Sequence, residues 1–233
     1  MRRLASCACG LLLVGCANTR EERLPPAVEP EVLIARAAPP AVDVDHLARA
    51  AACVERGDEP AAVPHLEAHL AARPDAVMIR AYLAELLLRT GKPADARAEF
   101  ERFTRQACGM TGEAGRHLVH AHTRLMEIAE AANDPFAEHL HRGIALVLMV
   151  RQWEGEPPTD HGELTEATLA KAARELRLAE RREPTDPRPS VYLAEVYDRL
   201  GQPTAARTAA RRVKRPDAGL TGAEQDAVRK IAE

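Results

Sequence analysis

Apolar residues recur along most of the chain at the spacing of one helix face, and glycine or proline interrupts them at regular points. The pattern is clearest over residues 44–107, which hold two blocks of the same design: a helix-length run, a glycine turn and a second helix-length run. The turn glycines, Gly57 and Gly91, are 34 residues apart, and Leu66 and Phe100 share that offset. A fixed period of this length with two helices per unit predicts a solenoid of stacked helix pairs. The breaks are too frequent for the long helices of a coiled coil.

The later part of the chain predicts further helices of the same kind. We expect them over the following residues: 113–131, 136–153, 164–182, 187–213 as a pair, and 220–233. Residues 133–135 replace the glycine turn between the first two of these, and the apolar run 144–150 is expected to be buried. Thr221, followed three residues later by Glu224, is typical of a capping box at the start of the last helix.

Composition makes the helical interpretation stronger and excludes one class of function. Hydrophobic residues make up 46% of the chain but aromatic residues only 3%, because alanine supplies much of the apolar count. Alanine, leucine, arginine and glutamate are strong helix formers, so the chain is expected to be all-α. The formal net charge of −3, with basic residues interleaved with acidic ones, gives no electrostatic argument for nucleic-acid binding.

The repeating units resemble those of the tetratricopeptide family. The residues that fit the family pattern best are a small residue in the first helix, the turn glycine, and an alanine and a larger apolar residue in the second helix: Ala50, Gly57, Ala62 and Leu66; Ala84, Gly91, Ala96 and Phe100; and Ala194, Gly201, Ala206 and Val213. His46 and Arg49 depart from the pattern in the first unit, where the family has tryptophan and leucine. The resemblance covers residues 43–213 and implies a right-handed α-solenoid of helix hairpins with about ten helices.

The resemblance also implies a division of the chain. The solenoid spans residues 43–219, with a capping helix over 220–233. Within the solenoid, the clear units and the degenerate middle are expected at these positions: 43–75, 77–109 and 187–219 for the units, and 113–184 for the middle.

The N-terminus resembles a bacterial lipoprotein signal peptide. Arg2 and Arg3 precede a short apolar stretch that ends in the sequence LVGC at residues 13–16, as in a lipobox. The stretch is too short to span a bilayer as a helix. We therefore expect residues 1–15 to be removed and Cys16 to carry the lipid anchor, followed by a proline-rich tether over 16–42. Ala17, in place of the aspartate that retains many such proteins at the inner membrane, favours the periplasmic face of the outer membrane.

The best candidate for a functional surface is the concave groove, which the first helix of each unit lines in this family. The residues at the groove positions are Val44, Leu47, Ala51, Val54, Met78, Ala81, Glu85, Leu88, Arg89, Arg188, Val191 and Glu195. The lysines and asparagines with which chaperone-binding members capture a peptide C-terminus are missing here, so that mode is not expected. The apolar end of this groove suits an amphipathic helix or an extended peptide of a protein partner.

Little else in the sequence carries chemistry. There is no nucleophile elbow, phosphate-binding loop or paired CxxC motif, and we expect no enzyme activity and no cofactor. The clustered histidines invite a metal hypothesis, which rests on the following residues: His65, His69, His117, His120, His122, His139 and His141. Solvated or helix-capping histidines are the simpler interpretation. Cys53 and Cys108 lie in different units and are expected to be buried free thiols.

Three hypotheses follow from the sequence. The leading one is a membrane-anchored, non-enzymatic scaffold for protein–protein interactions in the bacterial cell envelope. The second is a structural lipoprotein that assembles with copies of itself through its groove. The third is an envelope protein that binds a metal through the central histidines.

Overall fold

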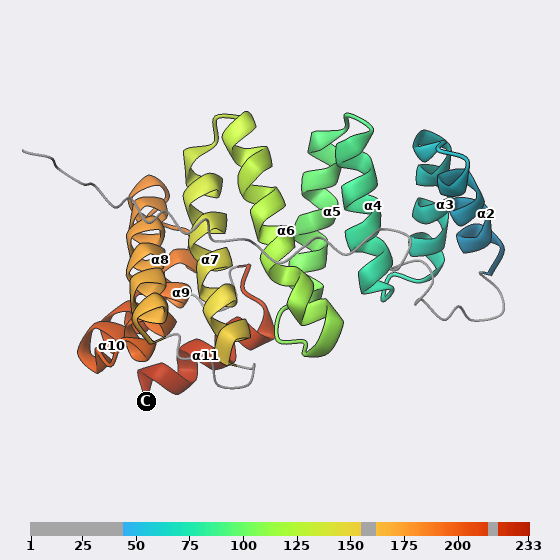
Figure 1. The fold of residues 1–233 in the computed structure, drawn as a ribbon. Helices are drawn as coiled ribbons and strands as arrows, with labels where there is room; N and C mark the ends of the chain where they lie inside the picture. Colours follow the sequence, from blue (N-terminus) through green and yellow to red (C-terminus); the bar gives the residue numbers. More distant parts are fainter. Residues whose placement is uncertain (1–43, 155–161, 214–218) are drawn as a thin grey trace, which may run out of the picture.

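The computed structural model describes residues 44–154, 162–213 and 219–233, with the side chains of residues 44 and 45 left out. These residues form ten α-helices and no strand, so the expected all-α solenoid is confirmed. The helices are α2 (Val44–Glu55), α3 (Glu59–Ala72), α4 (Val77–Arg89), α5 (Pro93–Ala107), α6 (Gly112–Ala131), α7 (Pro135–Glu154), α8 (Gly162–Arg182), α9 (Arg188–Arg199), α10 (Pro203–Arg212) and α11 (Gly222–Ala232). Figure 1 shows α2 to α8 side by side in one row, with α10 and α11 below α8 and α7. The predicted signal peptide and tether lie outside the described residues.

The turns explain why the helices end where they do. Gly57, Gly91 and Gly201 all have positive φ angles, between 67° and 76°, which glycine adopts without steric cost. The turn between α6 and α7 instead uses Asn133, with φ of 53°, and asparagine is among the few other residues that tolerate this region. Asp134 then accepts a hydrogen bond from the backbone N–H of Ala137 and so caps α7.

Small residues let the helices approach one another closely. Ala62 and Ala96 are fully buried, as expected for their places in the helix pairs. Gly143, in the middle of α7, faces α8 at a point where a Cβ atom would lie 2.7 Å from Cγ of Leu176. The run from Ile144 to Val150 is buried throughout, which confirms the expectation from its sequence. The core is therefore built by alanine, glycine and leucine at helix crossings, with few aromatic side chains.

The middle of the row departs from simple pairing. Three helices, α6, α7 and α8, stand between the hairpin α4–α5 and the hairpin α9–α10. Helix α7 packs extensively against both α6 and α8 and also contacts α9. Successive helices joined by short turns run in opposite directions, as Figure 1 shows for α4–α5 and α6–α7.

The last helix begins as expected. The Thr221 side chain accepts from the backbone of Glu224 and the Glu224 side chain accepts from the backbone of Thr221, so the capping box is confirmed. In the described residues, no helix has the length and apolar character needed to cross a membrane.

Candidate functional site

The residues predicted to line one groove fall on helices that do not all meet. Helix α9 contacts α7, α8, α10 and α11, and among the described helices it contacts none of α2 to α6. Arg188, Val191 and Glu195 on α9 are thus separated from the predicted groove residues of α2 and α4. The predicted groove residues therefore form two sets, one on α2 and α4 and the other on α9.

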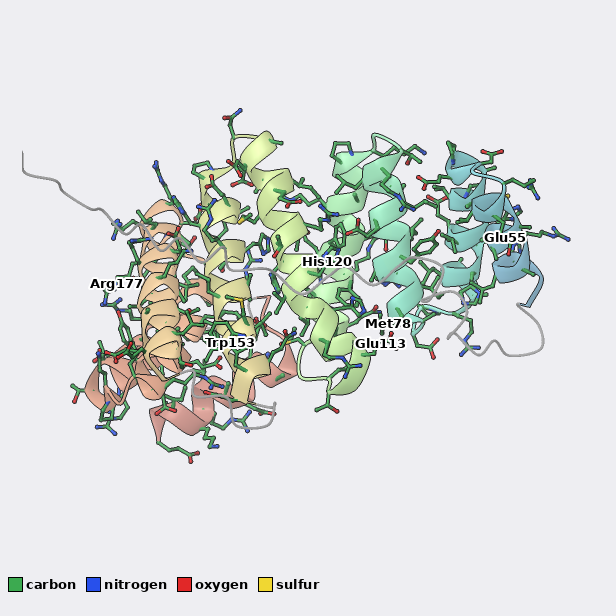
Figure 2. All side chains as sticks on the ribbon, in the orientation of Figure 1. Glu55, Met78, Glu113, His120, Trp153 and Arg177 are labelled. Carbon is green, nitrogen blue, oxygen red and sulfur yellow. The ribbon has the colours of Figure 1, made fainter. Side chains whose placement is uncertain are left out.

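The first set, on α2 and α4, is largely apolar. Leu47 and Ala81 are buried in the core. The other apolar members of this set with described side chains are half-buried and open to a ligand in part: Ala51, Val54, Met78 and Leu88. Figure 2 labels Met78 near one end of α4. The side chain of Val44 lies outside the described residues.

The charged residues of α4 are bound within the chain. Oε1 of Glu85 lies 2.5 Å from Nε2 of His120 and accepts from Nε of Arg124 at 3.0 Å, both on α6. Burial alone would raise the pKa of Glu85, but His120 and Arg124 outweigh it and lower that pKa. Arg89 is more exposed and contacts Glu59 at 2.9 Å. The Glu85 network therefore ties α4 to α6.

The second set, on α9, faces a different environment. Arg151 of α7 donates two hydrogen bonds to the Glu195 carboxylate, one of them at 2.6 Å, and Arg199 adds a third at 3.0 Å. Burial alone would lower the pKa of Arg151, but the Glu195 carboxylate, through its hydrogen bond and its charge together, has the larger effect and raises that pKa. The pair therefore stays charged. Arg188 donates to Asp186, with its Nη2 atom 2.6 Å from Oδ2. Val191 is buried beside them.

A polar chamber of about 60 Å³ lies where α5, α6, α7, α9 and α11 converge. Its lining residues are Glu101, Thr104, Arg105, Cys108, Leu118, His122, His141, Ile144, Leu148, Arg151, Arg188, Tyr192, Gly219, Thr221 and Glu224. A cavity of this size has room for a few water molecules, since each needs about 10–15 Å³. Of the predicted groove residues, only Arg188 lines this chamber.

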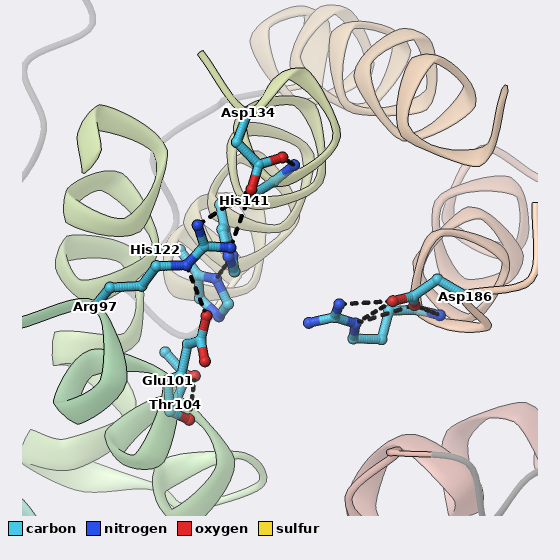
Figure 3. Close-up of polar contacts among 9 residues, drawn as sticks. Arg97, Glu101, Thr104, His122, Asp134, His141 and Asp186 are labelled. Atoms are coloured by element: carbon cyan, nitrogen blue, oxygen red, sulfur yellow. Dashed lines mark hydrogen bonds and ion pairs between the residues drawn. The ribbon is translucent and has the colours of Figure 1, made fainter. Parts of the chain in front are cut away.

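A pair of histidines forms part of the chamber wall. Nδ1 of His122 on α6 and Nδ1 of His141 on α7 are 3.0 Å apart, and both side chains are buried (Figure 3). Burial, together with the charges of Arg188 and Arg151, lowers the pKa of His122 to about 3. Burial and the same kind of cationic surroundings also lower the pKa of His141 well below its usual value. Both rings are therefore neutral at neutral pH, and one Nδ1–H donates to the other ring.

An ion-paired arginine lies beside the histidine pair. Arg97 of α5 donates to Glu101 at 3.0 Å and to Asp134 at 3.1 Å, so it links α5 to the start of α7 (Figure 3). The guanidinium groups of Arg97 and Arg188 both act electrostatically on His141. A cation placed at the histidine pair would be repelled by these groups.

The start of α11 forms another part of the chamber wall. Oγ1 of Thr221 lies 3.2 Å from Sγ of Cys108, at the end of α5. The hydroxyl of Tyr192 on α9 donates to Glu224 at 3.0 Å, and burial raises the pKa of Tyr192 well above 10, so it remains a donor. The closing helix expected at the end of the solenoid thus also crosses to the link between α5 and α6.

The other histidines and the two cysteines of the helical part lie at separate places in the described residues. His139 lies 2.9 Å from Glu175 of α8, while the rings of His46 and His65 are 5.9 Å apart. His69 and His117 are buried. Within the described ranges, no group of three or more His, Cys, Asp or Glu side chains is arranged to hold a metal ion. Both cysteines of the helical part are free, but Cys108 is only half-buried, because it lies at the exposed link after α5.

Sequence reasoning missed two features of this region. The chamber depends on residues from five helices whose convergence the repeat pattern does not encode. Arg80 on α4 was also missed, although it is buried and bonds with Glu99, Gln106 and the carbonyl of Pro74. An arginine in an otherwise apolar helix stretch, followed 19 residues later by a glutamate, was the available signal.

Comparison with known families agrees with the helix pairs. A family model described as tetratricopeptide repeat matches residues 46–68, 77–102 and 187–212. These segments coincide with the pairs α2–α3, α4–α5 and α9–α10. The matches lie in the first two helix pairs and the last helix pair of the described residues. Helices α6 to α8, between the repeats, have no match to that model.

Comparisons over the whole chain give a similar solved structure and no similar curated sequence. None of the curated protein sequences is significantly similar to the chain. Among solved structures, the chain is similar to the crystal structure of MamA protein, with 14% sequence identity, coverage of 82% of this chain and 93% of that chain, and a TM-score of 0.40.

Proposed function

We propose that the chain is a non-enzymatic scaffold for protein–protein interactions, anchored through Cys16 to a bacterial envelope membrane, with the outer membrane as its site. The observation that carries the scaffold proposal is the set of half-buried apolar side chains on the first helices of the two N-terminal repeats. Val54, Met78 and Leu88 pack against the core on one side and leave part of their surface uncovered. Apolar side chains at such positions suit the apolar face of a partner helix or peptide.

The electrostatics of the same face support a partner that binds through apolar contacts. Glu85 is already bonded to two side chains of α6, so its charge is balanced within the chain. Arg89, near the end of α4, is the more exposed charge and would lie at the rim of such a contact. Balanced charges beside an apolar strip favour burial of the strip, because no lone charge has to be desolvated.

The partner hypothesis predicts a site-specific cross-link. A photoreactive phenylalanine analogue in place of Leu88 should give adducts with another protein in intact cells, since Leu88 lies in the proposed contact. The matched control places the same analogue at Glu67, an exposed residue of α3 in the neighbouring hairpin. Mass spectrometry of the adducts identifies the partner, and an adduct of two copies of the chain would indicate self-assembly instead. Equal adduct yields at the two positions would contradict the proposal.

The anchor hypothesis predicts a change of fraction. In a diderm bacterial host, the chain should sediment with membranes after a high-salt wash, because two or more acyl chains give stable anchoring. The Cys16→Ser variant should move to the soluble fraction or keep its uncleaved leader, while a Cys53→Ser control should sediment like the unaltered chain. Membrane association that persists in a Cys16→Ser chain whose leader has been removed would refute a lipid anchor at this residue.

A further inference from the structure

Helix α11 does more than cover the end of the last repeat. It packs on α9 and α10, and its first residues also reach the link between α5 and α6, more than a hundred residues earlier in the chain. In Figure 1 it lies below α7 and extends toward the lower end of α6. A Cβ atom at Gly109 would lie 2.9 Å from Cβ of Ala223, so the two backbones approach closely there. Gly219, Thr221 and Glu224, at the start of this segment, form part of the chamber wall.

The contacts at its first turn are polar and specific. One Glu224 oxygen accepts from the backbone N–H of Thr221 at 2.7 Å, and the other accepts from the Tyr192 hydroxyl at 3.0 Å. The Thr221 hydroxyl lies between this carboxylate and the thiol of Cys108. The capping box thus both starts the helix and fixes it to α9 and to the end of α5.

The apolar anchoring of α11 is slight. Within Leu220 and the helix that follows, only Leu220 and Val228 are buried apolar side chains, each with 9% of its surface exposed. Ile231 and Ala232 are partly buried against the core. Segments with so few buried apolar contacts open at a low free-energy cost compared with the rest of a fold.

Apart from the Tyr192 hydroxyl, which donates to Glu224, the polar groups named below are paired without α11. Arg151 is bonded to Glu195, and Arg188 to Asp186, while His122 and His141 bond to each other. Release of α11 would expose these groups to water as complete pairs, with no buried charge left alone. We call the surface that α11 covers, on α9, α10 and the link between α5 and α6, the α11 groove. This groove can exist without α11, or with another helix in its place.

We propose that α11 is a built-in ligand of this groove, and that an amphipathic helix of a protein partner takes its place. This inference rests on the proposed scaffold function and names the partner's chemistry at a second surface. We expect the partner helix to begin with a Ser/Thr-x-x-Glu box, whose carboxylate accepts a hydrogen bond from Tyr192. It should carry apolar residues at the positions of Leu220 and Val228. It occupies the chamber side of the row, away from the half-buried apolar strip of α2 and α4.

The first test measures whether α11 opens, with the Cys108 thiol as the probe. Maleimide labelling of the full chain, resolved by peptide mass spectrometry, compares Cys108 with Cys53, which is buried in α2 and serves as an internal control. The Val228→Asp variant should label at Cys108 at least about tenfold faster, because a buried carboxylate disfavours the closed position. Lys230→Asp, which adds the same group on the exposed face of α11, should label like the unaltered chain.

The second test asks whether the opened groove binds a helix in trans. The probe is a synthetic peptide of residues 219–233, and binding is measured by fluorescence anisotropy. The peptide should bind the Val228→Asp chain more tightly than the unaltered chain. A Thr221→Cys variant places a thiol next to Cys108; its oxidised form should lose peptide binding and its reduced form should regain it. Circular dichroism confirms that each variant keeps its helical content.

The outcomes separate this inference from the scaffold proposal. Cys108 labelling that does not change in Val228→Asp, or peptide binding that persists in the disulfide-locked form, would overturn the built-in ligand. Failure of the peptide to bind a chain whose Cys108 has become reactive would also overturn it. None of these results depends on a cellular partner, so the Leu88 cross-linking experiment can fail or succeed independently.

Discussion

Replacement of Arg80 by methionine should lower the free energy of unfolding by about 3–5 kcal/mol, as expected when one partner of a buried ion pair is removed. Arg80 is only 7% exposed, and it donates to Glu99 at 2.7 Å, to Gln106 at 2.9 Å and to the carbonyl of Pro74 at 3.1 Å. Methionine fills similar space but leaves the Glu99 carboxylate and the Pro74 carbonyl with fewer donors. Urea unfolding followed by circular dichroism measures the change.

The control for Arg80→Met replaces Arg102, a second partner of the Glu99 carboxylate. Arg102 also pairs with Glu99, but its side chain is 53% exposed, so Arg102→Met should cost less than about 1 kcal/mol. If the two variants lose similar amounts of stability, the buried network around Arg80 does not hold α4 and α5 together. A large loss for Arg80→Met alone would assign the stabilisation to the buried arginine.

Acidification should destabilise the chain through the histidine pair. The unfolded chain binds a proton at His122 near pH 6.5, whereas the folded chain, with a pKa of about 3 at this residue, does not. Below pH 6.5 the unfolded state therefore binds more protons, and the free energy of unfolding falls as the pH falls. For His122 alone the loss is about 2 kcal/mol between pH 6.5 and pH 5, at about 1.4 kcal/mol per unit. His141 acts in the same direction, because its pKa is also lowered by burial.

Urea unfolding at several pH values tests this effect. His122→Asn should remove about 2 kcal/mol of the acid-induced loss, since asparagine does not titrate. Leu125→Ala, on the same helix and also buried, should lower stability by a similar amount at every pH and leave the pH dependence unchanged. A pH dependence that is the same with His122→Asn as in the unaltered chain would show that the pair does not titrate with unfolding.

The parts of the fold that local pattern controls could be predicted from the sequence. Helical spacing located the helices, and Gly57, Gly91 and Gly201 located the turns, because each turn needs a positive φ. Thr221 and Glu224 predicted the first turn of α11, because a capping box involves only residues that are close in sequence. The buried run from Ile144 to Val150 followed from its apolar character alone.

Contacts between distant helices could not be predicted in the same way. The sequence places His122 and His141 in two successive predicted helices, but only the packing of α6 on α7 shows that the two rings face each other. The contact between Cys108 and Thr221 joins residues 113 positions apart, and no repeat period encodes it. The family pattern predicts the groove positions of α9, but it does not anticipate the three helices between the matched regions.

The three helices between the two matched regions have a consequence for how this chain tolerates insertions. Because neighbouring helices alternate in direction, a change of one helix in this region would turn one end of the protein over relative to the other. A change of two helices would leave both ends facing as they do now and alter only their separation. The N-terminal apolar strip lies on α2 and α4, and the surface covered by α11 lies on α9 and α10, so the helices between them set their relative orientation. Natural variants that differ in length here should differ by whole helix pairs wherever that relative orientation is kept.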